Sequence, residues 1–180
     1  MSIPTRIRLI RRAQLSRPFR VALACLSVLV LLLVLHLIFF DMRPVEGHSM
    51  IPTLQEGEWV LVAKQSYLLR APVYGELVVC QPAGSTSLWI KRVVGLPGDV
   101  LEARDGSLYR NGAPVQEPYL DVETPDFSPI KAWDGEYLLL GDDRADSQDS
   151  RLPNIGAIPH DEILGHAIFV FWPVNKWRSI

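Results

Sequence analysis

The chain has 180 residues, of which 48% are hydrophobic and 21% are charged, and its formal net charge is −2. This length suits one domain plus an apolar segment, and the lack of a net basic charge argues against a nucleic-acid partner. The charge is unevenly spread, because residues 1–20 contain six arginines and no acidic residue. The rest of the chain is therefore acidic.

The run VALACLSVLVLLLVLHLIFF, residues 21–40, is interrupted only by Ser27 and His36. About 20 apolar residues are what an α-helix needs to cross a bilayer. A cleaved leader would end in small residues, whereas this run ends in Phe39 and Phe40. We expect a basic cytoplasmic N-terminus at 1–20, a transmembrane helix at 21–40 and an extracytoplasmic domain at 41–180, oriented by the arginines.

The extracytoplasmic part is predicted to be mainly β. Short runs rich in Val, Ile, Leu and aromatic residues alternate with turn-forming pairs. The expected strands lie in WVLVAK (59–64), ELVVCQ (76–81), SLWIKRVVG (87–95), DVLEA (99–103), EYLLLG (136–141) and HAIFVFW (166–172). SLYRNGAPV predicts a hairpin that turns at Asn111-Gly112. Residues 121–132, with Pro125 and Pro129, are expected to form an exposed loop.

The candidate nucleophile is Ser49, in GHSMIPTL. Its neighbour His48 would point to the opposite face of an extended segment, although a Ser-His-Asp triad cannot be judged from sequence alone. The other candidate base is Lys91, in LWIKRVVGLPGD. A lysine is protonated at neutral pH unless burial lowers its pKa, and the apolar residues around Lys91 could do so.

Four ordered segments resemble type I signal peptidases, which are membrane-anchored serine proteases. They are SMIPTL around Ser49, GELVV at 75–79, KRVVGLPGD at 91–99 and GDDRADSQDSR at 141–151. The resemblance implies an antiparallel β catalytic domain in which Ser49 is the nucleophile and Lys91 the general base. Ser147 matches the serine that orients the lysine amine.

The resemblance also implies supporting residues. Structural ion pairs match Arg92, Asp142, Asp149 and Arg151, and pockets for the substrate's small residues match Val45, Met50, Leu54, Trp89 and Ile90. The chain departs from the family at Gly47, where some longer members have a serine, and at Asp143 and Ala145, where asparagine and aspartate are common. Four residues separate Arg151 from Gly156, where two are usual.

The resemblance implies cleavage of signal peptides after small residues (A-x-A) at the bacterial inner membrane. The partners would be pre-proteins and membrane lipid. The spacing of Asp142, Asp143, Asp146 and Asp149 does not fit a calcium loop, so we expect no metal and no other cofactor. Two alternatives stay open: a processing peptidase with one dedicated exported substrate, and an inactive membrane-anchored scaffold.

Overall fold

The computed structural model describes residues 17–120 and 122–180. These residues form two compact units that divide after Leu37. The predicted basic N-terminus at 1–20 lies outside the described residues, except for its last four positions. The two units are therefore considered one at a time.

The first unit contains most of helix α1 (Arg17–Phe39). Its mean hydropathy is 3.0, and by length and composition it could cross a membrane. None of the residues of α1 is buried against protein. The helix ends one residue earlier than the predicted span, because Phe40 already pairs with Ala63 in a β-ladder.

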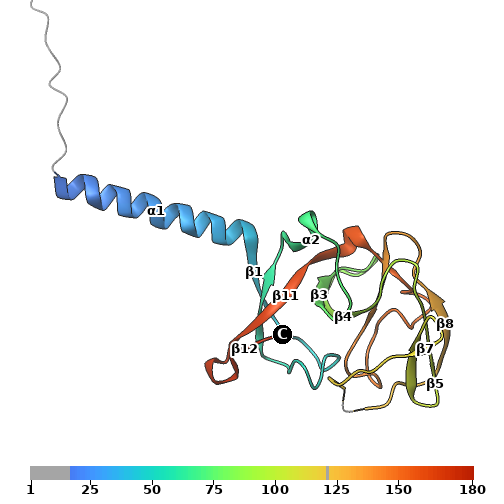
Figure 1. Cartoon of the computed structure of the whole chain (residues 1–180). Coiled ribbons are helices and arrows are strands. Elements are labelled where there is room, and N and C mark those ends of the chain that lie inside the picture. Colours follow the sequence, from blue (N-terminus) through green and yellow to red (C-terminus); the bar gives the residue numbers. More distant parts are fainter. Residues whose placement is uncertain (1–16, 121) are drawn as a thin grey trace, which may run out of the picture. The chain divides into compact units, whose positions relative to one another are not determined.

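The second unit is mainly β, as predicted, and all of its strand pairs are antiparallel (Figure 1). The larger sheet has the strand order β1-β2-β11-β3-β4-β9-β10, with β12 paired to β11, and the smaller has the order β7-β6-β5-β8. The strands are β1 (Phe40–Pro44), β2 (Trp59–Ala63), β3 (Leu77–Cys80), β4 (Trp89–Gly95), β5 (Val100–Arg104), β6 (Ser107–Arg110), β7 (Ala113–Pro114), β8 (Phe127–Lys131), β9 (Glu136–Leu140), β10 (Ile158–Pro159), β11 (Ile163–Trp172) and β12 (Arg178–Ser179). The short helices are α2 (Ser66–Leu69), η1 (His160–Glu162) and η2 (Val174–Lys176).

Apolar side chains are buried on both faces of the larger sheet. On strand β9, Tyr137 and Leu139 pack into one cluster, while Leu138 and Leu140 pack into another that includes residues of the smaller sheet. This explains why EYLLLG reads as a continuous apolar run rather than an alternating one. A third cluster lies beneath the loop that carries Ser49.

The predicted hairpin is confirmed: β6 and β7 pair across Asn111 and Gly112, which both have positive φ. The predicted loop at 121–132 is partly wrong, because Phe127–Lys131 forms β8. Strand β8 is at the edge of its sheet, with β5 as its neighbour. An edge strand tolerates Pro129, which has no N–H to donate, so the proline was a poor guide to a loop here.

Candidate active site

Ser49 lies in a loop between β1 and β2 that is closed at its neck by backbone hydrogen bonds. The N–H of Val45 donates to the carbonyl of Glu58 (2.7 Å), and the N–H of Gly57 donates to the carbonyl of Val45 (3.0 Å). Gly47 has a φ of +75°, a conformation that favours glycine. The backbone of the loop that carries Ser49 is therefore held in a fixed position.

Lys91 meets Ser49 from strand β4. Its Nζ atom is 2.7 Å from Ser49 Oγ and 3.0 Å from Ser147 Oγ, and the residue is only 4% exposed. Burial lowers the pKa of Lys91, because the ammonium ion loses its hydration. The charges of Asp149 and Asp142 act in the opposite direction, so burial is the decisive cause.

Ser147 connects the lysine to a buried carboxylate. The Ser147 hydroxyl is one of the groups that lower the pKa of the Asp149 carboxyl group. Burial would raise the pKa of Asp149, but the ion pair with Arg151 and the N–H of Gly141 outweigh it. Lys91 is therefore hydrogen-bonded to both serines, and the charge of Asp149 lies close enough to act on Ser147 and Lys91.

The histidines have other partners. The His48 side chain is 60% exposed, and its Nε2 atom is 3.4 Å from a carboxylate oxygen of Glu56. His160 packs against Tyr137, and His166 packs against Tyr67. His36 lies within α1. Ser49 therefore has a lysine, and not a histidine, against its hydroxyl.

Gly141 lies where the side chain of any other residue would overlap its neighbours. A Cβ atom built on it would lie 2.2 Å from Ser147 Oγ and 2.4 Å from the carbonyl oxygen of Ser49. The same carbonyl accepts a hydrogen bond from the N–H of Asp143 (3.1 Å). The backbone at 141–143 is therefore in direct contact with the nucleophile loop.

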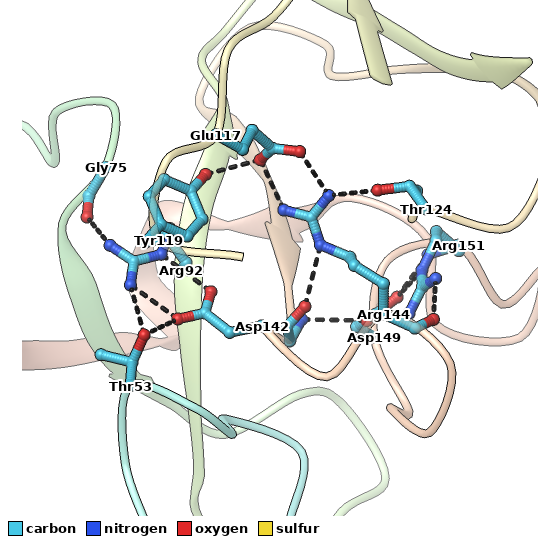
Figure 2. Close-up of polar contacts among 11 residues, drawn as sticks. Thr53, Gly75, Arg92, Glu117, Tyr119, Thr124, Asp142, Arg144, Asp149 and Arg151 are labelled. Carbon is cyan, nitrogen blue, oxygen red and sulfur yellow. Dashed lines mark hydrogen bonds and ion pairs between the residues drawn. The ribbon is translucent and has the colours of Figure 1, made fainter. Parts of the chain in front are cut away.

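Three buried ion pairs lie around this backbone (Figure 2). Arg92 donates to both carboxylate oxygens of Asp142, at 2.8 and 2.6 Å, and Asp142 also accepts from Thr53. Arg151 donates to both oxygens of Asp149, at 2.8 and 2.7 Å. These two pairs join the four residues that the family resemblance singled out.

The third ion pair, between Arg144 and Glu117, was not anticipated. Arg144 stands inside GDDRADSQDSR, and its neighbours gave no reason to choose it over the other charged residues there. Glu117 lies in a loop between β7 and β8, far from any recognised segment. Pro118 and Tyr119, which follow it, are the local sign in the sequence that this loop packs against the domain.

A cleft of about 640 Å³ opens beside Ser49 and Lys91. Four residues expected to contact substrate line it: Val45, Met50, Trp89 and Ile90. Leu54 does not line it, because its side chain is fully buried in the core beneath the loop, and its contact with substrate stays a prediction. Leu54 was chosen from the family resemblance, and its burial depends on how the loop folds onto the core.

Residues 19–172 match the family described as "Signal peptidase, peptidase S26". The chain belongs to this family. It is 35% identical to "Probable signal peptidase I-1" of Synechocystis sp. (strain ATCC 27184 / PCC 6803 / Kazusa), over 84% of this chain and 81% of that protein. It is 37% identical to "Signal peptidase I T" of Bacillus subtilis (strain 168), over 86% and 84%. A crystal structure of a signal peptidase I from Enterococcus faecalis V583 gives a TM-score of 0.48 at 28% identity, over 54% of this chain and 97% of that one.

Membership of the S26 peptidases makes the protein a serine endopeptidase and agrees with its mainly β fold. It also gives the cluster around Ser49 a chemical meaning. A serine hydroxyl against a buried amine is an arrangement in which a lysine, once neutral, can accept the hydroxyl proton.

Proposed function

We propose that this S26 peptidase removes N-terminal signal peptides from exported pre-proteins, with Ser49 as the nucleophile and Lys91 as the general base. The observation that carries the proposal is the 2.7 Å contact between the Lys91 amine, buried from solvent, and the Ser49 hydroxyl. The related proteins from Synechocystis and Bacillus subtilis are named signal peptidases, which supports the same substrate class.

In the first half of the reaction, Ser49 Oγ attacks the scissile carbonyl carbon while its proton passes to the neutral amine of Lys91. The resulting ammonium then donates a proton to the departing amine as the peptide bond breaks. A water molecule next attacks the acyl ester, with Lys91 again accepting a proton, and Ser49 is released. Backbone N–H groups near Ser49 would stabilise the oxyanion.

Ser147 would orient the base rather than touch the substrate. If it donates its own hydrogen to Asp149 and accepts one from Lys91, the amine's lone pair is left directed at the Ser49 hydroxyl. This arrangement does what the third member of a catalytic triad does for histidine.

The cleft suits an extended peptide with small side chains. Val45, Met50 and Ile90 line the cleft with apolar side chains, and Trp89 lies on β4, the strand that also carries Lys91. We propose that the segment before the cleavage site adds to the sheet edge as a strand and places its A-x-A residues in these shallow positions.

We further propose that α1 anchors the enzyme in the bacterial plasma membrane, with the arginine-rich N-terminus in the cytoplasm. Ser49 follows Phe40 by nine residues, so the connecting chain spans at most about 30 Å. A signal peptide is cut just beyond its own apolar segment, and a site close to the bilayer surface suits that substrate.

The test is cleavage of a secretory precursor by the purified full-length protein in detergent. We expect a new N-terminus directly after an A-x-A sequence, identified by N-terminal sequencing, and no product with Ser49→Ala. If wild-type protein leaves several precursors intact, or cuts at unrelated positions, the proposed function is wrong.

A further inference from the structure

The ion pair between Glu117 and Arg144 is the most deeply buried one that the preceding reaction does not use. The Arg144 side chain is 0% exposed and that of Glu117 is 7% exposed. Two guanidinium nitrogens of Arg144 donate to the two carboxylate oxygens of Glu117, at 2.6 and 2.5 Å. A buried charge pair with this fork geometry fixes both partners in position.

Arg144 carries this constraint to Gly141. Its Nε atom donates to the carbonyl oxygen of Gly141 at 3.0 Å. The N–H of Gly141 donates to Asp149 on the other side, at 3.0 Å. Both polar groups of Gly141 are thus held by ion-paired side chains, the carbonyl by Arg144 and the N–H by Asp149.

Gly141 is the point where this constraint reaches the reacting atoms. Its Cα lies against the hydroxyl of Ser147 and the carbonyl of Ser49 so closely that a Cβ would overlap both. A displacement of the Gly141 peptide therefore moves the contact between these two serines and Lys91.

The loop that contains Glu117 makes two further contacts with arginines, one with Arg92 and one with Arg144. The Tyr119 hydroxyl donates to Glu117, and its ring lies 3.8 Å from the guanidinium carbon of Arg92. Thr124 accepts a hydrogen bond from Arg144 at 2.8 Å. The loop therefore holds two of the three arginines that surround the 141–143 backbone.

We propose that Glu117 is a positioning residue for hydrolysis: it fixes Arg144, which holds the Gly141 carbonyl and thereby the spacing of Ser49, Lys91 and Ser147. The inference rests on the proposed peptidase function. Glu117 does not line the cleft, so it acts through the base and nucleophile and not through substrate binding.

Neutralising Glu117 should have two separable effects. The Gly141 carbonyl loses its fixed donor, and a misplacement of about 1 Å at a reacting group can cost about 100-fold in rate.

The second effect is electrostatic. Arg144 becomes an unpaired buried cation, which disfavours protonation of Lys91. The charged or titrating groups that already act on Lys91 are Asp149, Cys80, Arg151 and Asp142. The uncompensated charge of Arg144 should therefore move the acid limb of the rate profile to lower pH.

The experiment compares full-length wild type, Glu117→Gln and the double variant Glu117→Gln/Arg144→Met on one A-x-A peptide across pH. For Glu117→Gln we expect kcat to fall by roughly 10- to 100-fold with KM unchanged. The double variant removes the unpaired charge, so its Tm and the position of its acid limb should return toward wild type. Its kcat should stay low, because Gly141 still lacks its donor.

Glu123→Gln is the matched control, because this acid belongs to the same loop and is exposed. Its kcat and pH profile should equal those of wild type. Recovery of kcat in the double variant would show that only the unpaired charge had done harm, and the positioning role would be wrong. Unchanged kcat in Glu117→Gln would also overturn it. Failure of wild type to cleave would instead refute the proposed function.

Discussion

The Nζ atom of Lys91 lies 3.0 Å from the Oγ atom of Ser147, although 56 positions of sequence separate them. The lysine is on a strand and the serine is in a loop, so the contact exists only in the folded chain. We interpret it as the contact that directs the amine toward Ser49.

Replacing Ser147 by alanine tests this interpretation. Without the hydroxyl the amine keeps its buried site but loses its orientation, so we expect kcat to fall by roughly 10- to 1,000-fold. KM should change little, because Ser147 does not line the cleft. Steady-state kinetics on an A-x-A peptide give both values, and an unchanged kcat would mean that another group orients Lys91.

The buried lysine should cost stability. Its folded pKa is lowered by burial, whereas the unfolded chain has the usual value near 10.5. Between these two values the unfolded chain binds a proton that the folded chain does not, so wild-type stability rises with pH across that range. Lys91→Met has no such proton, and we expect it to be more stable than wild type at neutral pH by roughly 1–2 kcal/mol.

The check is chemical unfolding of both proteins from neutral to alkaline pH. The advantage of Lys91→Met should shrink as the pH approaches the unfolded pKa. Lys131→Met, which removes an exposed lysine, should show no such trend. A Lys91→Met variant that is less stable than wild type at neutral pH would contradict the reading that burial dominates.

Glu58 should tie the C-terminal segment to the nucleophile loop. It is 1% exposed and accepts hydrogen bonds from Arg178 at 2.6 and 3.0 Å. Burial would raise its pKa, but the hydrogen bonds and charge of Arg178 lower it overall. This stabilisation is complete above the unfolded pKa near 4.5 and is lost as pH falls through the lowered folded pKa.

We therefore expect Glu58→Gln to lower the free energy of unfolding by about 1–3 kcal/mol at neutral pH. The difference from wild type should vanish in acid. Glu56→Gln provides a control in the same loop, because Glu56 is exposed. A penalty for Glu58→Gln that stayed constant into acid would show that charge is not its cause.

The arginines before α1 should set the orientation of the protein in the membrane. Protease added outside spheroplasts should digest the β domain and spare a tag on the N-terminus. Immunoblotting for the tag reads the result directly. Loss of the tag from intact spheroplasts would reverse the proposed topology.

Local patterns in the sequence were enough for most of the β domain. The expected strands each overlap one observed strand, and Asn111-Gly112 turns the hairpin as predicted. Strand β1 was missed because Phe40–Pro44 has no strand pattern in its own sequence. It is a strand because it pairs with β2. Pairing over distance decides such strands, and a short window of sequence does not contain it.

The site residues also fall into those that motifs in the sequence predicted and those that depend on the tertiary fold. Ser49, Lys91 and Ser147 were chosen from motif blocks, and the structure brings them together. The burial of Leu54 and the ion pair of Glu117 were not foreseen, since burial and ion pairing depend on the tertiary fold. Leu54 was chosen from the family resemblance, and Glu117 was passed over because its partner is 27 positions away.

The most direct test of the dyad is the rate at which purified Lys91→Met cleaves a secretory precursor, measured beside wild type at equal folded concentration. Methionine has a similar length and cannot accept a proton, so only the base is removed. We predict no product above the level of Ser49→Ala, together with an unfolding curve that shows a folded protein. Cleavage by folded Lys91→Met at a rate near wild type would contradict the assignment of Lys91 as the general base.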